Sequence, residues 1–286
     1  MGINRRGFFS ALGVTGLALA IGKKTPASPR VLSNVEFWGI LYDSTRCVGC
    51  RTCEYECAAA HGLPEPPSEV EAVRTTNETC NTVVNTFQSS KGEVYVKRQC
   101  MHCNEPACCA ACLTRAMHKN ETGPVTWNGD KCMGCRYCMV SCPFDGPKFE
   151  YHRANPKIQK CDMCFERQKA GVKPICAANC PNEALLFGTR RELIREARRR
   201  IVENPDLYTD QIYGEHDAGG TGWLYLSSVP FEETGMNTRL QQSSYPALTK
   251  GFLYSVPSIF VLLPTLLLGI YQSTKNNQLK ETDDEQ

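Results

Sequence analysis

Residues 132–143 read CMGCRYCMVSCP, and this stretch decides how the rest of the chain is interpreted. Its four cysteines follow the spacing C-x2-C-x2-C-x3-C, and a proline comes directly after the last of them. A disulfide framework spreads its cysteines along the chain, because a bridge stabilises most when it closes a long loop. Four thiols within eleven residues instead wrap a short peptide around one metal centre. The stretch therefore predicts metal binding rather than disulfide bonding.

Three further cysteine groups occur in the chain, and eighteen cysteines in 286 residues is several times the usual content. The four groups are Cys47, Cys50, Cys53 and Cys57; Cys100, Cys103, Cys108 and Cys112; Cys132, Cys135, Cys138 and Cys142; and Cys161, Cys164, Cys176 and Cys180. The spacing C-x2-C-x2-C-x3-C-P is the bacterial ferredoxin pattern for [4Fe–4S] clusters. Three cysteines of such a run bind one cluster, and the fourth ligates a second cluster. The groups must therefore work in pairs.

Zinc is the strongest alternative metal, because it also binds C-x2-C pairs. A zinc site uses two such pairs far apart in the chain, whereas groups one and three each offer a third cysteine at the same short interval. Haem attachment needs the run C-x-x-C-H, and here Cys103 is followed by Asn104. Four motifs in order predict iron–sulfur clusters, and a zinc-bound structural scaffold is the alternative from another class.

The chain resembles the four-cluster iron–sulfur subunits of bacterial respiratory oxidoreductases, over roughly Leu41 to Gly251. The phrases that carry the likeness are LYDSTRCVGCRTC, KRQCMHCNEPACC, CMGCRYCMVSCPFDGPKFEY, KCDMC, CPNEALLFGTRREL and IYGEHDAGGTGWLYLSSVPFE. The resemblance implies an α+β fold of two interleaved ferredoxin-like dicluster modules that hold four [4Fe–4S] clusters. In this family the first cysteine group pairs with the fourth, and the second pairs with the third.

The resemblance implies four sets of ligands, one for each cluster. Set one is Cys47, Cys50, Cys53 and Cys180; set two is Cys57, Cys161, Cys164 and Cys176; set three is Cys100, Cys103, Cys108 and Cys142; and set four is Cys112, Cys132, Cys135 and Cys138. Cys108 is preferred to the adjacent Cys109 because it keeps the family's four-residue gap after Cys103. Cys80 has no ligand spacing and is interpreted as a spare thiol.

The two ends of the chain predict export and membrane attachment. Arg5 and Arg6, followed by the weakly apolar run from Ser10 to Ile21, are typical of a twin-arginine signal, although a basic N-terminus without function would look similar. Gly251 to Tyr271 is an uncharged apolar stretch that as a helix would reach about 31 Å, enough to cross a bilayer. A buried core helix is the alternative. The pattern predicts a periplasmic body held to the cytoplasmic membrane by one C-terminal helix.

The predicted organisation follows the chain from end to end. Residues 1–30 form the signal and linker. Module A is divided into a first half over 36–92, with a surface excursion from Leu63 to Ser90, and a second half over 151–190, and module B is inserted between them over 93–150. A basic helix and an extended strap follow over 191–250, then the membrane anchor over 251–271 and a polar tail over 272–286. Within these segments, alternation predicts strands over Glu93–Lys97 and Val125–Trp127. A basic helix is predicted over Thr189–Ile201, and either solvent or an acidic partner would explain its charge.

No residue pattern indicates a substrate site, so the chain is predicted to carry electrons without catalytic residues of its own. A net charge of +2 gives no electrostatic reason to expect nucleic acid. The resemblance implies a catalytic oxidoreductase subunit as one partner (a hydrogenase small subunit or a molybdopterin subunit) and an integral membrane quinone-reactive subunit as the other. The export signal, the anchor and the phrase SSVPFEETG favour the anchored subunit of a periplasmic [NiFe] hydrogenase. A formate dehydrogenase or other molybdopterin enzyme, and a multihaem cytochrome–quinone complex, are the alternatives.

Overall fold

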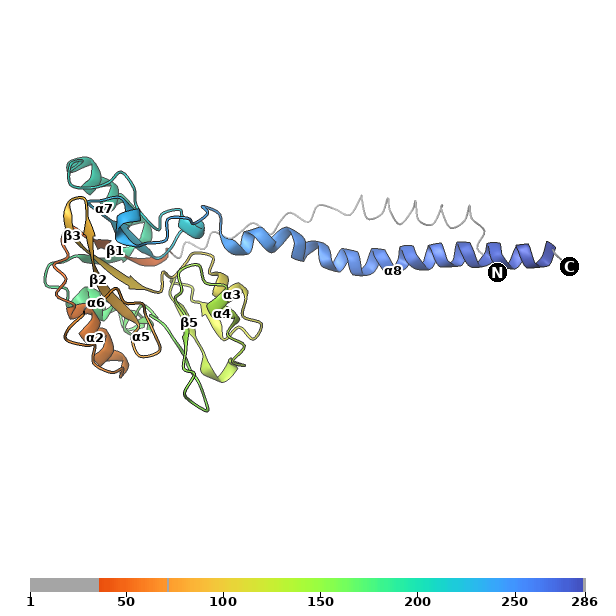
Figure 1. The fold of residues 1–286 in the computed structure, drawn as a ribbon, viewed down its shortest axis with the longest axis horizontal. Coiled ribbons are helices and arrows are strands. Elements are labelled where there is room, and N and C mark those ends of the chain that lie inside the picture. The colour runs from red at the N-terminus through yellow and green to blue at the C-terminus, as the bar shows by residue number, and fades with distance from the viewer. Residues whose placement is uncertain (1–35, 71, 285–286) are drawn as a thin grey trace. The chain divides into compact units, whose positions relative to one another are not determined.

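The fold is described from a computed structural model over residues 36–70 and 72–284. The twin-arginine run lies outside the described residues. The chain divides into two compact units, and the unit Val35–Leu248 contains all eighteen cysteines. This unit mixes short helices with short strands, as the predicted α+β class requires (Figure 1).

A three-stranded sheet forms the core of the cysteine-containing unit. Its central strand β1 (Trp38–Asp43) pairs with β8 (Leu185–Thr189) in antiparallel fashion and with β9 (Trp223–Leu226) in parallel fashion. All four residues of β9 are buried. The sequence assigns this segment to an extended strap. The structure corrects that interpretation, because the apolar run WLYL completes the sheet.

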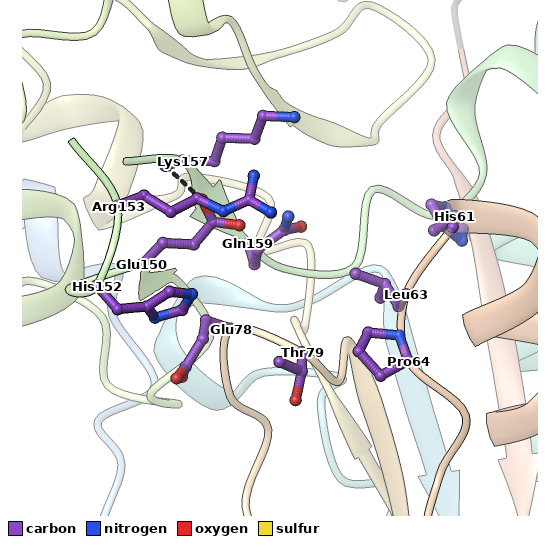
Figure 2. Close-up of a pocket in the computed structure, with 11 residues that line it drawn as sticks. His61, Leu63, Pro64, Glu78, Thr79, Glu150, His152, Arg153, Lys157 and Gln159 are labelled. Carbon is purple, nitrogen blue, oxygen red and sulfur yellow. Dashed lines mark hydrogen bonds and ion pairs between the residues drawn. The ribbon is translucent and has the colours of Figure 1, made fainter. Parts of the chain in front are cut away.

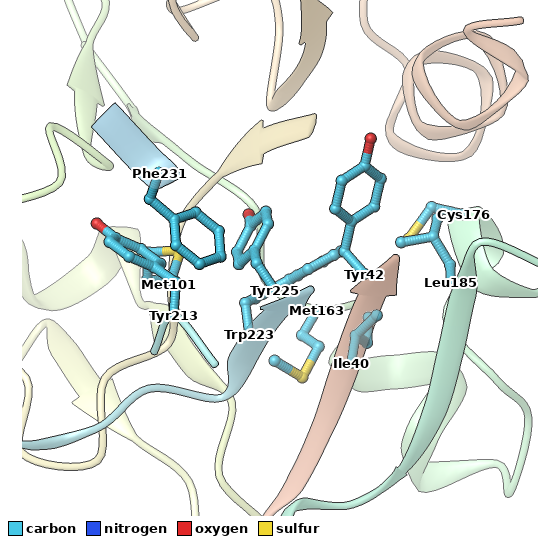
Figure 3. Packing of buried hydrophobic residues seen from close by; sticks show 10 residues of the cluster. All are labelled: Ile40, Tyr42, Met101, Met163, Cys176, Leu185, Tyr213, Trp223, Tyr225 and Phe231. Atoms are coloured by element: carbon cyan, nitrogen blue, oxygen red, sulfur yellow. The ribbon is translucent and has the colours of Figure 1, made fainter. Parts of the chain in front are cut away.

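Alternation along β1 sends neighbouring side chains to opposite faces of the sheet. Ile40 and Tyr42 pack on one face with Tyr213, Trp223 and Tyr225, in a cluster that also contains cysteines from groups one, two and four (Figure 3). Leu41 and its neighbours on the other face pack against helix α7 (Arg190–Glu203). The sheet therefore separates the cysteine-rich side of the unit from its basic helix.

Helix α7 confirms the predicted basic helix and extends it by two residues at its C-terminal end. Thr189 caps it, because its side chain accepts from the amide of Glu192 while the Glu192 carboxylate accepts from the amide of Thr189. At the other end Arg200 is buried and donates to Asp43, whose side chain is fully buried. One face of the helix is thus fixed to β1, and most of the arginines face solvent.

A hairpin of β2 (Thr82–Ser89) and β3 (Gly92–Gln99) leads into the second cysteine group. Strand β3 confirms and lengthens the predicted strand. Strand β2 lies inside the predicted surface excursion, and its first four residues are buried. Sequence reasoning missed it because polar residues interrupt the alternation. Asn85 can be buried because its side chain exchanges hydrogen bonds with the backbone of Arg74.

Short elements surround the remaining cysteines. The small hairpins are β4 (Met117–Lys119) with β5 (Val125–Trp127) and β6 (Lys148–Phe149) with β7 (Ile158–Gln159). The helices are α2 (Thr52–His61), α3 (Ala107–Ala110), α4 (Tyr137–Val140), α5 (Phe165–Lys169) and α6 (Ile175–Ala178), with 3-10 turns at Gly129–Lys131, Asp217–Gly219 and Phe231–Thr234. Strand β5 has the bounds that the sequence predicts.

The C-terminal segment is one long helix, α8 (Tyr245–Asp284), which contains Pro257 and Pro264. Its stretch Tyr245–Thr274 is long and apolar enough to cross a membrane, with a mean hydropathy of 2.0 in its most apolar window. None of that window is buried, which argues against the alternative of a buried core helix. The predicted anchor, 251–271, lies within it, and the helix is a candidate membrane anchor.

Candidate iron–sulfur sites

All eighteen cysteines lie within the described residues, and none of them forms a disulfide. Helix α2, which contains Cys53 and Cys57, packs against α6, which contains Cys176. Helix α3, which contains Cys108, packs against α4, which contains Cys138. The first cysteine group therefore meets the fourth, and the second meets the third.

The four cysteines of set one line one pocket. The loop after β1 supplies Cys47 and Cys50, the first turn of α2 supplies Cys53, and Cys180 follows α6. Tyr42 and the buried Lys97 line the same pocket. Burial raises the pKa of Cys53 to about 11; repulsion from Cys47 acts in the same direction, and Lys97 opposes it.

The cysteines of set two lie deeper in the molecule, since Cys57, Cys164 and Cys176 are all buried. Burial raises the pKa of Cys176 to about 12, against the attraction of Lys97, and the charges of Cys57 and Cys164 raise it further. Burial likewise raises the pKa of Cys161, with Cys57 as the next cause. Thiols that raise one another's pKa in this way are close together, and only a bound cation would hold them as thiolates at neutral pH.

The cysteines of sets three and four lie close together in a second region of the unit. Burial raises the pKa of Cys103, and the charges of Cys100, Cys142 and Cys108 raise it further. Burial also raises the pKa of Cys138 to about 11, with further contributions from the neighbouring thiols Cys108, Cys112, Cys132 and Cys135. Cys108 thus faces members of both sets. Every cysteine that the sequence assigns to a set lies beside other members of that set.

Within group one and within group three, the backbone makes the same sharp turns between successive cysteines. Gly49 and Arg51 both have positive φ, at 68° and 58°, and Gly134 and Arg136 repeat this at 71° and 59°. At Gly49 glycine is required for a second reason, because a Cβ there would lie 2.3 Å from the ring of Tyr95. Successive left-handed turns point backbone N–H groups into a concavity that suits an anionic group.

Backbone amides already donate to three of the sulfurs. The N–H groups of Met117, Gly146 and Met163 lie 3.3 Å from the Sγ atoms of Cys112, Cys142 and Cys161 respectively. Hydrogen bonds to ligand sulfurs stabilise the thiolate and are one means by which a protein sets the potential of an iron–sulfur cluster. These contacts fit [4Fe–4S] clusters as the bound group.

His102 supplies a further observation that fits such a cluster. The ring is buried, and its Nδ1 accepts from the amide of Val125 at 2.9 Å, so the proton resides on Nε2. Burial and the nearby Lys160 lower the pKa of His102, so the ring is neutral. Among the described residues Nε2 has no partner. A buried N–H without an acceptor is costly, and a sulfur of a cluster beside Cys100 and Cys103 would accept from it.

The two remaining cysteines differ in their surroundings. Cys109 is partly buried and packs in the same apolar cluster as Cys108 and Cys112, and a hydrogen bond with Cys109 is the largest cause that raises the pKa of Cys108. Cys80 donates from Sγ to the carbonyl of Thr82 at 2.9 Å. Cys80 is therefore satisfied without a metal, whereas Cys109 lies beside Cys108 of set three.

A larger cavity of about 320 Å³ lies away from the sulfurs, and no cysteine lines it (Figure 2). Glu150 on its wall pairs with Arg153 at 3.6 Å and accepts from the amide of Lys157. Glu150 and Arg153 thus neutralise each other, and we assign no cluster to the cavity.

Comparison with known proteins decides the family. Residues 92–190, which contain cysteine groups two, three and four, match the 4Fe-4S dicluster domain. Hydrogenase-2 operon protein HybA of Escherichia coli O157:H7 is 32% identical over 99% of both chains. The chain belongs to the HybA-like family of iron–sulfur subunits.

Other relatives place this HybA-like chain among respiratory oxidoreductases. A protein of Nitratidesulfovibrio vulgaris is 43% identical over 96% of this chain and 78% of its own length. The B subunit of anaerobic dimethyl sulfoxide reductase from Haemophilus influenzae is 38% identical over 56% of this chain and 77% of its own. The chain is therefore a ferredoxin-type electron-transfer subunit with [4Fe–4S] clusters as its cofactor.

Sequence reasoning identified the cysteines but missed the polar groups that surround them. Lys97, His102 and Lys160 are all buried among the cysteine sets. Lys160 directly precedes a C-x2-C pair, but so does the exposed Lys131, so the sequence carried no signal that singled it out. Lys97 lies in a strand whose neighbours alternate in polarity, and the sequence did not single it out either.

Proposed function

We propose that this chain carries four [4Fe–4S] clusters, one on each cysteine set, and conducts electrons between a periplasmic catalytic subunit and a membrane quinone-reactive subunit. The proposal rests on one observation above all: α2 packs on α6 and α3 packs on α4. Ferredoxin spacing requires each group to supply its fourth cysteine to the cluster of its partner group. This arrangement supports that requirement, because it brings the partner groups together. Bound clusters would supply one-electron carriers in a line through the protein.

The residues around the sulfurs support this role. Buried side chains such as Tyr42 and Met163 pack beside the cysteines and exclude water. Cys50 and Cys135, in sets one and four, are exposed and give the two end clusters access to partners. We propose that groups one and four form module A and that groups two and three form module B, interleaved within it at the boundaries that the sequence predicts.

We propose a [NiFe] hydrogenase as the catalytic partner, with electrons derived from H2 oxidation. The match to a hydrogenase-2 operon protein extends over 99% of both chains, so it includes the C-terminal helix. The match to the B subunit of a dimethyl sulfoxide reductase covers 56% of this chain. A molybdopterin enzyme is the second candidate partner because of that match.

We propose that α8 anchors the chain in the cytoplasmic membrane, with the cluster-bearing unit in the periplasm after twin-arginine export. The apolar stretch Tyr245–Thr274 supports the anchor. Replacing Arg5 and Arg6 with lysine should leave the cluster-bearing unit in the cytoplasm. Accessibility to added protease in spheroplasts would measure this, and a body that is still cleaved from outside would contradict the export route.

The partner can be tested on the membrane-bound complex. The tagged chain should be purified anaerobically from detergent-solubilised membranes, with co-purifying subunits identified by mass spectrometry. H2 should bleach the visible absorption of the clusters if the partner is a hydrogenase. Bleaching by formate, with a molybdopterin subunit in the sample and no response to H2, would favour the second candidate. A colourless sample that contains zinc would contradict the electron-transfer role itself.

A further inference from the structure

Two lysines, Lys97 and Lys160, are buried in the cysteine-containing unit, with exposed fractions of 1% and 7%. Lysine is almost never fully buried unless it is paired. Within residues 36–70 and 72–284, neither ammonium group lies within ion-pair distance of a carboxylate. Within the same residues each donates hydrogen bonds only to neutral oxygens. The two buried charges therefore require a counter-charge that no paired carboxylate in the described part of the chain provides.

Lys97 lies between sets one and two. It lines the pocket of Cys47, Cys50, Cys53 and Cys180, its Nζ donates to the hydroxyl of Thr82, and it lies 5.2 Å from the centre of the Trp223 ring. Burial lowers the pKa of Lys97, but attraction to Cys53 and then to Cys176, Cys57 and Cys161 outweighs burial and raises it overall. The first of these sulfurs belongs to set one and the other three belong to set two.

Lys160 lies between sets two and three. Its Nζ donates to the carbonyls of Val125 and, at 2.8 Å, Cys161. Burial lowers the pKa of Lys160, and attraction to Cys100, Cys161 and Cys108 raises it overall. Asp162 is a weaker influence, because its Oδ1 accepts from His61 and from the amide of Cys164. Cys161 belongs to set two and Val125 packs against Cys108 of set three, so the Nζ of Lys160 lies between two neighbouring sets.

An isolated buried ammonium costs several kcal/mol or more, and proteins remove that cost by pairing the charge or by neutralising the group. A [4Fe–4S] cluster with four thiolates carries a net negative charge, and a one-electron reduction makes it more negative. An ammonium group beside the cluster thus stabilises the reduced form more than the oxidised form. No proton moves in this step, because the lysine stays charged throughout.

We propose that Lys97 and Lys160 are the built-in counter-charges of the cluster chain, placed at the junctions between clusters one and two and between clusters two and three. Both raise the reduction potential of cluster two, and each also raises the potential of one neighbour. The inference rests on the proposed function. Cluster two therefore receives the positive charge of both lysines, whereas clusters one and three each receive that of one.

The experiment compares reduction potentials in the full chain within its complex. Lys97→Met and Lys160→Met remove the charge and keep the approximate volume, and Lys97→Arg and Lys160→Arg keep the charge. Exposed lysines provide matched controls: Lys91→Met lies in the turn of the same hairpin as Lys97, and Lys157→Met lies close to Lys160 in the sequence. Reduction would be followed by EPR during a potentiometric titration, and iron would be counted in every sample.

The expected result is at least a tenfold loss in the reduction equilibrium of the bordering clusters, about 59 mV for a one-electron couple. Lys97→Met should lower the potentials of clusters one and two, and Lys160→Met should lower those of clusters two and three. One EPR signal, that of cluster two, should therefore shift in both variants. The arginine variants and the controls should keep wild-type potentials. Removing one charge of a buried pair is destabilising, so a methionine variant that loses iron while the matching arginine variant keeps it also supports the counter-charge role.

Unchanged potentials in both methionine variants would overturn the inference. An equal shift in the methionine and arginine variants would also overturn it, because that pattern indicates a packing role rather than a charge. The wild-type sample tests the proposed function separately. If the wild-type chain contains no iron and gives no cluster signals, the proposed function is contradicted, whatever the variants show.

Discussion

The imidazole of His61 lies 3.1 Å from the carboxylate of Asp162, measured from Nε2 to Oδ1, and this contact joins the first cysteine group to the fourth. The other ring nitrogen, Nδ1, lies 2.9 Å from the carbonyl oxygen of Cys57. Both nitrogens therefore face oxygen acceptors, which requires a doubly protonated ring. The hydrogen bond with Asp162, and then the contact of Nδ1 with the Sγ of Cys57 at 3.7 Å, raises the pKa of His61 to about 11.

Removal of this contact should loosen set two. In Asp162→Ala, the amide of Cys164 loses its acceptor and His61 loses its partner. We expect about four irons per chain to be lost on gel filtration, which is the content of one cluster. Iron analysis after the column measures this. Glu166→Ala, at an exposed carboxylate that pairs with Lys169 on the same helix, is the control. Equal iron in both variants would contradict this role for Asp162.

A single ligand replacement should remove or convert one cluster. Cys135→Ala affects set four alone, and we expect its EPR signal to disappear or to become that of a three-iron cluster, with the other signals retained. Cys80→Ser is the control, because Cys80 only donates to a backbone carbonyl. Wild-type EPR spectra from Cys135→Ala would refute the assignment of set four.

The adjacent pair Cys108 and Cys109 can be separated by serine substitutions. We expect Cys108→Ser to lose cluster three and Cys109→Ser to keep it, because the spacing from Cys103 favours Cys108. Iron content and EPR measure both. Cluster loss in Cys109→Ser alone would reverse the assignment.

His102 should raise the potential of cluster three through its Nε2–H. His102→Phe removes this donor and keeps a planar ring, and a net hydrogen bond of about 1 kcal/mol predicts a potential lower by about 40 mV. A potentiometric titration followed by EPR measures the shift. His118→Phe, at an exposed ring on β4, is the control. A potential in His102→Phe that is equal to the wild type would show that Nε2–H has no cluster acceptor.

The buried pair Arg200–Asp43 should stabilise the sheet independently of the clusters. Arg200 donates to Asp43 at 2.8 Å, and Tyr208 donates to the same oxygen at 2.8 Å. Arg200→Ala leaves the buried carboxylate with the more distant Arg46, 3.8 Å away, and loss of a partner from a buried pair costs about 3–5 kcal/mol. Urea unfolding followed by fluorescence should show the loss. Arg195→Ala, exposed on the same helix, should change stability by less than about 0.5 kcal/mol.

The cysteine groups, the basic helix and the apolar C-terminal stretch could be predicted from the sequence because each is a local pattern. Spacing identifies a metal-binding run, and capping residues such as Thr189 and Glu192 mark where a helix begins. The position of β9 could not be predicted in this way. Its pairing with β1 joins residues far apart in the chain, and four apolar residues among glycines carry no periodic signal.

The polar groups around the sulfurs could not be predicted from local sequence patterns either. Lys97 occurs in an alternating strand where lysine ordinarily faces solvent, and only the fold turns it toward two cysteine sets. The proton of His102 lies on Nε2 because Nδ1 accepts from the amide of Val125, which belongs to the hairpin of β4 and β5. Such groups are determined by tertiary contacts, which is why the sequence predicts the ligands of a cluster but not its environment.

The cluster content of the anaerobically purified chain tests the four-cluster assignment most directly. Iron and acid-labile sulfide analysis, combined with Mössbauer spectroscopy, should give about sixteen of each per chain, all in [4Fe–4S] clusters. About eight irons per chain, or zinc in place of iron, would contradict the assignment of four clusters to the four cysteine sets.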